Sequence, residues 1–135
     1  MSTDPQPTSS DHLLLFRNAG NESHAQLTDA ERAALAERWN NWVATLLAED
    51  RLRGGHPLAL DGRVVSGPRS GRVTDGPYAE TKEVVGGYVI VRADSLDHAA
   101  EIARGCPGLD IGLTVEVRAL LDRSPVLGAV RAVSA

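Results

Sequence analysis

The chain has 135 residues, of which 42% are hydrophobic and 24% charged, as in ordinary globular proteins. This length predicts one domain with a buried core. The net charge is -4, whereas a surface that binds the phosphates of nucleic acids is positively charged. We therefore expect no nucleic-acid partner. No apolar run reaches the roughly 18 residues of a membrane span, and the N-terminus lacks a signal-peptide pattern. We therefore expect a cytoplasmic protein with no membrane partner.

Cysteine and histidine usage argues against a metal centre. Cys106 is the single cysteine, so the chain forms neither an internal disulfide nor a thiolate-rich zinc site. No two histidines have the HExxH spacing, and we expect no metal and no cofactor. His12, at a strand start, is expected to be exposed, and Cys106 is expected to be an unreactive packed thiol.

The first half of the chain predicts a tail, a strand and a long helix. Residues 1–10 are polar with two prolines and form a disordered tail, before a domain over residues 11–120. Leucines and a phenylalanine at four consecutive positions, 13–16, indicate a strand covered on both faces. Thr28 and Glu31 fit a capping box that begins an amphipathic helix of about 20 residues, ending near Asp50.

The middle of the chain predicts short extended pieces joined by turns. Residues 57–60, 63–66 and 72–74 read as strands, with a hairpin turn at Asp61-Gly62 between the first two. A further turn begins at Asp75-Gly76-Pro77.

The last part predicts a strand, a helix and a strand. Residues 84–92 are highly apolar, and Gly86-Gly87 within them marks a bulge or a close backbone approach. Asp94 or Ser95 caps a second helix, which Gly105 and Pro107 end. Residues 113–120 alternate between apolar and polar side chains, as in a strand with one buried face. Residues 121–135 form a C-terminal extension without a clear element.

This order of elements predicts an α+β fold. A strand, helix, hairpin region, strand, helix and strand give a ferredoxin-like antiparallel sheet with both helices on one face. The apolar runs at 13–16 and 88–91 then leave apolar side chains on the uncovered face. A second copy of the sheet covers that face in a homodimer.

The chain resembles the YCII-related family, specifically its branch named for an Asp-Gly-Pro-Phe (DGPF) motif. The similarity extends from about Leu13 to Leu120. The residues that carry it are Asp75-Gly76-Pro77-Tyr78-Ala79-Glu80-Thr81-Lys82-Glu83, Gly86-Gly87-Tyr88, Ser95-Leu96-Asp97 before Ala99 and Ala100, Cys106-Pro107, and Glu116-Val117-Arg118.

The resemblance implies a dimeric α/β barrel and a function that is less settled than the fold. Most members have no assigned activity, some are encoded beside sigma factors, and a His and Asp pair in the cleft has been proposed as catalytic in the wider family. Tyr78 stands here at the phenylalanine of the motif. His56 follows Gly54-Gly55, where an acidic residue is expected in much of the branch, and is not the family's proposed histidine.

The motif around Asp75 holds the densest set of functional side chains and is our candidate site. Asp75 is the candidate general base, with His56 as a second candidate catalytic residue. An alternative reading keeps Asp75 as a cap of its own turn. The candidate ligand-binding residues are Tyr78, Glu80, Lys82 and Trp42, although Trp42 also fits the apolar core stripe of the long helix.

Two functions remain open from the sequence. In the first, a homodimer binds an unknown small molecule and carries out metal-independent acid/base chemistry of lyase or isomerase type. In the second, the protein is a non-enzymatic accessory or ligand-sensing protein linked to transcriptional regulation, with a sigma factor as the regulatory partner that the resemblance suggests. A catalytic base with a positioned hydrogen-bond partner would distinguish the enzyme from the accessory protein.

Overall fold

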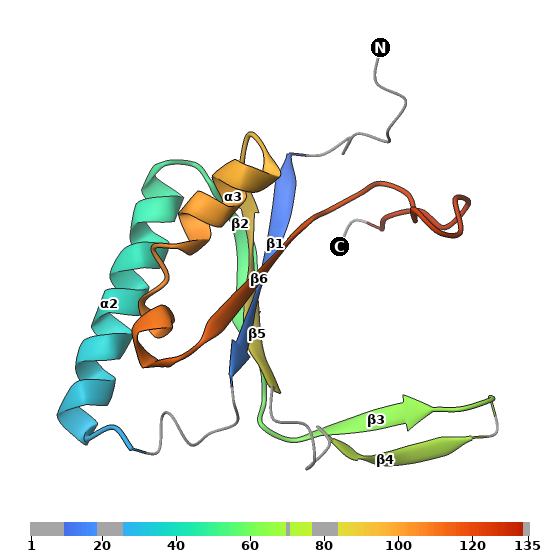
Figure 1. The fold of residues 1–135 in the computed structure, drawn as a ribbon, viewed down its shortest axis with the longest axis horizontal. Helices are drawn as coiled ribbons and strands as arrows, with labels where there is room; N and C mark the ends of the chain where they lie inside the picture. Colours follow the sequence, from blue (N-terminus) through green and yellow to red (C-terminus); the bar gives the residue numbers. More distant parts are fainter. Residues whose placement is uncertain (1–9, 19–25, 70, 77–83, 134–135) are drawn as a thin grey trace.

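The computed structural model describes residues 10–18, 26–69, 71–76 and 84–133. At its centre is a four-stranded antiparallel sheet in the order β2-β5-β1-β6. Helices α2 (Asp29–Ala48) and α3 (Leu96–Ala103) lie on one face of this sheet (Figure 1). The strands are β1 (Asp11–Asn18), β2 (Leu52–Pro57), β5 (Val84–Arg92) and β6 (Thr114–Ala119). This is the predicted ferredoxin-like α+β arrangement.

Strand β1 lies in the middle of the sheet between β5 and β6. Its side chains alternate, so Leu14 and Phe16 are buried toward the helices, whereas Leu13 and Leu15 are half-buried on the opposite face. Leu13 pairs with Ile90 and Leu15 with Tyr88 on β5. We call the face that carries these four residues the open face, because the two helices cover the other one.

Helix α2 begins at the predicted capping box. The Thr28 hydroxyl accepts a hydrogen bond from the Glu31 backbone amide, and the Glu31 carboxylate accepts one from the Thr28 amide at 2.9 Å. The helix runs for 20 residues, as expected. Helix α3 is capped by Ser95, whose hydroxyl accepts from the His98 amide. Both helix starts were therefore readable from sequence.

The hairpin region differs from the sequence prediction. Strands β3 (Gly62–Ser66) and β4 (Arg72–Gly76) form a separate two-stranded sheet that projects from the end of the main sheet, away from α2 (Figure 1). The predicted hairpin turn at Asp61-Gly62 is wrong, because Gly62 begins β3. The chain reverses instead in the segment between β3 and β4. Asp75 and Gly76 belong to β4, where Asp75 pairs with Arg63, and the rest of the predicted turn, from Pro77, lies outside the described residues.

Strand β2 was not predicted, because residues 52–57 have no alternation of apolar and polar side chains. Its pairing with β5 defines it. A Cβ on Gly55 would lie 2.6 Å from the Tyr88 carbonyl oxygen and 2.9 Å from Val89 Cα, so the two strands approach too closely for any larger residue. Gly54 and Gly55 therefore belong to an edge strand of the sheet.

The glycine pair of β5 forms the predicted bulge. Phe16 pairs with Gly87 and Arg17 with Val85, which leaves Gly86 as the extra residue on β5. The bulge lies near the end of β1 and the start of β5, at the end of the sheet from which strands β3 and β4 project (Figure 1).

The core lies between the sheet and the two helices. Phe16 makes edge contacts with Trp39 and Trp42 of α2, with ring centroids 5.1 and 6.2 Å apart. Trp39 also packs against the backbone at Gly108, in the short 3-10 helix η1 (Pro107–Ile111). The buried members of the core are Leu14, Phe16, Leu46, Val89, Val91, Ala103, Cys106 and Leu113.

The chain beyond β6 extends away from the helices, on the same side as the hairpin (Figure 1). Arg123 and Arg131 form an isolated β-bridge within it, and Val126, Leu127 and Val133 are exposed. In the described residues, no helix has the length and apolar character that crossing a membrane requires.

Candidate functional site

A cavity of about 960 Å³ lies between α2 and the β2 side of the sheet, and the segment that follows β2 contributes to its wall. Its lining residues come from α2, the end of β1, β2 and the segment after it, β5, and Leu113. Ligand sites of small molecules have volumes of about 300–1,000 Å³. The cavity is therefore large enough for a metabolite.

The lining that faces the helices is apolar and aromatic. Phe16, Val89 and Leu113 are buried core residues, and Trp39 and Val43 of α2 lie opposite them. This wall suits the apolar body of a ligand, because burial of each methylene group contributes about 0.8 kcal/mol.

The polar part of the lining contains one side-chain pair. His56 Nδ1 lies 3.0 Å from the Tyr88 hydroxyl, and the two rings are 5.9 Å apart. The residues face each other because β2 and β5 pair them in register on the open face. His56 is exposed and Tyr88 is half-buried. Since both line the same cavity as Trp39, the lining includes residues of both faces at this end of the sheet.

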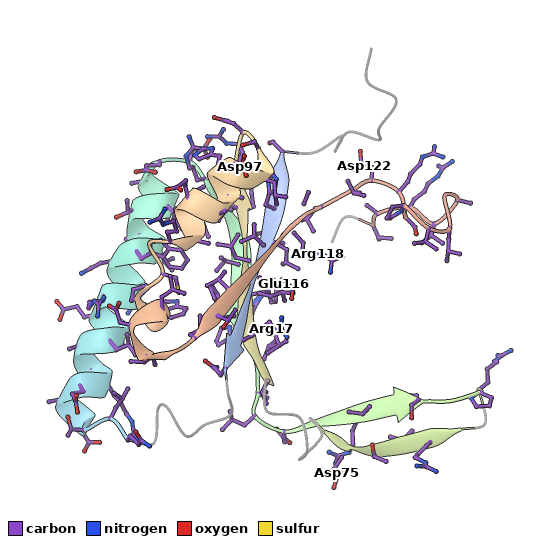
Figure 2. The ribbon with its side chains drawn as sticks, in the orientation of Figure 1. Arg17, Asp75, Asp97, Glu116, Arg118 and Asp122 are labelled. Carbon is purple, nitrogen blue, oxygen red and sulfur yellow. The ribbon has the colours of Figure 1, made fainter. Side chains whose placement is uncertain are left out.

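Asp75 is not among the lining residues. It lies on β4, where its side chain is 93% exposed and Asp75 Oδ1 is 3.4 Å from Arg63 Nη1. Figure 2 shows it on the projecting hairpin, apart from the main sheet and its helices. The structure therefore brings His56 to the cavity without Asp75, and a catalytic role for Asp75 stays a prediction.

The other predicted site residues fall into two groups. Tyr78, Glu80 and Lys82 lie outside the described residues. Trp42 packs in the core against Phe16 and Trp39 and does not line the cavity.

The lining contains residues that the sequence did not single out as site candidates. They include Trp39, Tyr88, Arg32 and Asn40. Trp39 was visible as part of the helical stripe, and Tyr88 as the end of the Gly-Gly-Tyr motif. Their common site depends on β2, the strand that the sequence did not reveal.

Cys106 is buried away from this cavity. Its side chain belongs to the core, and burial raises the pKa of the thiol against the smaller opposite effect of hydrogen bonds from the Gly108 and Leu109 backbone. Within the described ranges, no group of three or more His, Cys, Asp or Glu residues is arranged to hold a metal ion.

The open face of the sheet carries a charged network beside its apolar residues. Arg17 and Arg118 both pair with the Glu116 carboxylate, at 2.9 and 3.4 Å (Figure 2). Arg17 and Glu116 are partly exposed, and Arg118 is exposed. Next to them lie the half-buried side chains of Leu13, Leu15, Tyr88 and Ile90.

The fold and the cavity define a ferredoxin-like α+β domain with a ligand-sized cavity at one edge of its sheet. The model of the YCII-related domain matches residues 13–122, which is most of the chain. The chain belongs to this family, as the sequence motifs indicated. A search of curated proteins gave no match.

Proposed function

We propose that this protein is a homodimer that binds a small metabolite in the cavity between α2 and the β2 edge of the sheet. The observation that carries the proposal is the cavity itself, which joins an apolar aromatic wall to the hydrogen-bonded pair of His56 and Tyr88. Membership in the DGPF branch is part of the same proposal. It rests on the motif that begins at Asp75.

In its enzymatic form, the proposal assigns metal-independent acid/base chemistry to His56. Histidine changes its charge near neutral pH, and the hydrogen bond to Tyr88 supplies the positioned partner that a general base requires. Asp75 is the second candidate base. Its exposed position on the hairpin means that a catalytic Asp75 requires the hairpin, or a second copy, to bring it to the cavity.

A non-enzymatic function is the second candidate. The Asp75 carboxylate is exposed and, among the described residues, lies beside Arg63 on the projecting hairpin, which favours a ligand-sensing or accessory protein. A link to transcriptional regulation through a sigma factor belongs to this candidate.

A metabolite screen by thermal shift tests the cavity. A ligand raises the melting temperature of the native chain by mass action. In Asn40→Trp, a bulky ring on an exposed position of the cavity wall fills the entrance, so the shift is lost. The control is Asn41→Trp, the neighbouring exposed residue of α2, which is not a lining residue and keeps the shift. A shift that survives in Asn40→Trp places the ligand elsewhere and contradicts the proposal.

The same ligand separates the two functions. Its conversion, followed by NMR over several hours, identifies an enzyme. In that case His56→Gln abolishes turnover while binding persists, and Asp75→Asn shows whether the hairpin carboxylate takes part. A ligand that binds tightly and stays unchanged supports the accessory function.

A further inference from the structure

The histidines that the structure describes differ in the group that faces their Nδ1 atom. In His12 this partner is a backbone carbonyl oxygen at 2.9 Å, which only accepts, so Nδ1 carries the proton. In His98 it is a backbone amide at 3.0 Å, which only donates, so Nδ1 of the neutral ring is unprotonated. The partner of His56 is the Tyr88 hydroxyl at 3.0 Å. Because a hydroxyl both donates and accepts, this contact permits either neutral tautomer.

Each tautomer gives the pair of His56 and Tyr88 one donor and one acceptor, at exchanged atoms. When Nδ1 donates to the hydroxyl oxygen, Nε2 accepts and the hydroxyl proton is available to a third group. When the hydroxyl donates to Nδ1, Nε2 carries the proton and the hydroxyl oxygen accepts. Both residues line the cavity, and His56 is exposed. The pair is therefore within reach of a bound molecule.

We propose that this pair is a proton relay, in which Tyr88 is the catalytic acid that acts together with the base His56 on an enolisable carbonyl compound. This inference rests on the enzymatic form of the proposed function and adds a second catalytic residue and the class of substrate. Such a compound has a C–H bond next to a carbonyl group. To form its enol, it loses a proton from carbon and gains one on oxygen, so it requires an acceptor and a donor together.

The relay conserves atoms and charge. It starts from the tautomer with the proton on Nδ1. Nε2 takes the proton of the α-carbon, the Nδ1 proton moves to the Tyr88 oxygen, and the proton already on that oxygen moves to the carbonyl oxygen. The electron pair of the C–H bond forms the C=C bond, and the π pair of the carbonyl binds the arriving proton. The products are a neutral enol and the other tautomer of His56, which returns a proton to carbon in the reverse step.

The relay also avoids separated charges. A histidine that acts alone leaves an imidazolium ion beside an enolate. Part of the cavity lining is apolar, at Phe16, Trp39 and Leu113, where such ions lose hydration. The relay begins and ends with neutral groups. Enolisation is also the first step of both isomerisation and elimination next to a carbonyl, so the relay serves either reaction type of the proposed function.

Deuterium exchange into 2-indanone, followed by proton NMR of the full chain in D2O at neutral pD, tests the relay. This probe is an uncharged, flat ketone. Because His56 is exposed, the proton that it takes is replaced by a deuteron before the reverse step. We expect exchange at least about a hundredfold faster than in buffer, the smallest usual contribution of acid/base catalysis. In His56→Gln and in Tyr88→Phe the rate falls to nearly that of buffer.

A second probe, 2-nitroindane, separates an acid from a positioning residue. Loss of the proton beside its nitro group gives a nitronate anion, which forms with a base alone. We expect Tyr88→Phe to slow the catalysed exchange of 2-indanone and to leave that of 2-nitroindane unchanged. Equal slowing of both probes would mean that Tyr88 only orients His56, and the catalytic assignment would be wrong. The matched control is His98→Gln, which leaves both rates unchanged because His98 does not line the cavity.

Binding of 2-indanone, measured by saturation-transfer NMR in the same samples, separates failure of the relay from failure of the proposed function. If 2-indanone binds to the native chain but not to Asn40→Trp, and exchanges at the buffer rate, the relay is wrong and the cavity remains a ligand site. Exchange that is equally fast in the native chain and in His56→Gln also contradicts the relay. If 2-indanone neither binds nor exchanges at millimolar concentration, the relay is contradicted, and the metabolite screen decides the proposed function by itself.

Discussion

His12 shows at the level of one residue how strand position controls burial. We expected an exposed side chain, but His12 is 3% exposed and its Nδ1 lies 2.9 Å from the Ser10 carbonyl oxygen. The reason is that β1 begins at Asp11, which places His12 in the helix-facing row with Leu14. The Ser10 carbonyl also accepts a hydrogen bond from the Ala93 amide, so this residue of the expected tail is bonded to the sheet.

Cys106 gives the first prediction at this scale. Burial shields the thiol from reagents. It also raises the pKa of the thiol, which lowers the fraction of the reactive thiolate. We expect Ellman's reagent at pH 7 to modify the native chain at least about a hundredfold more slowly than the urea-unfolded chain. Because this is the only cysteine, the absorbance reports one site. Rapid modification of the native protein would show that the thiol is accessible.

Gly55 gives the second prediction. A methyl group here would overlap the Tyr88 carbonyl and Val89 Cα, so Gly55→Ala forces β2 away from β5. We expect a loss of about 2 kcal/mol in the free energy of unfolding, measured in urea. Gly62→Ala is the matched control, because a Cβ there has its nearest neighbour at 3.6 Å. Equal stability of the two variants would contradict the close approach of the strands.

At the scale of elements, the start of α2 predicts a pH dependence. Hydrogen bonds from the Thr28 backbone and side chain lower the pKa of Glu31 in the folded chain. A lowered folded-state pKa means that the unfolded chain binds the proton more tightly. The stabilising contribution of Glu31 is therefore present above the pKa that it has in the unfolded chain, and it is lost as the pH falls through the folded-state pKa.

Glu31→Gln isolates this contribution, because glutamine still completes the capping box but does not titrate. We expect the native chain to be more stable than Glu31→Gln at pH 7, with the difference shrinking between pH 5 and pH 3 in urea unfolding. Glu37→Gln, at an exposed position farther along α2, is the control and shows no comparable trend. A difference that stays constant with pH would exclude the charge effect.

The elements also show where sequence patterns stop being informative. Both helices and strands β1, β5 and β6 were predictable, because caps, periodicity and apolar runs are local signals. Strand β2 has no local signal, because a Gly-Gly pair interrupts it and its partner strand is distant in the sequence. In the register of the two strands, Gly55 pairs with Val89, 34 residues farther along the chain. The Asp-Gly signal at 61–62 was misleading for the same reason, because the strand before it pairs elsewhere.

In the whole molecule, the candidate site was only partly predictable, because its residues come together through contacts between distant parts of the chain. His56 was recognisable as an unusual histidine after two glycines. Its partner Tyr88 and the aromatic wall at Trp39 reach the same cavity only through the pairing of β2 with β5 and the packing of α2. Asp75 belongs to a hairpin outside the main sheet, a separation that a motif read along the chain does not reveal.

The homodimer is the last prediction, and it concerns the open face. Leu15 and its neighbours Leu13 and Ile90 are half-buried in one chain, although no helix of the described residues covers them. A second sheet packed on this face would bury them, as apolar area removed from water stabilises an interface by about 25 cal/mol per Å². We expect sedimentation velocity at micromolar concentration to give twice the chain mass of 14.3 kDa.

Leu15→Asp places a carboxylate at the centre of this interface. Because the charge loses its hydration on association, we expect dimerisation to weaken by at least about a hundredfold. The variant then sediments as a monomer. The matched control is Leu47→Asp, the same change at a leucine that is 64% exposed on α2 and is not on the open face. This control remains a dimer, because α2 covers the opposite side of the sheet (Figure 1). A native chain that is monomeric at micromolar concentration, or a dimer that only Leu47→Asp disrupts, would contradict the packing of two open faces.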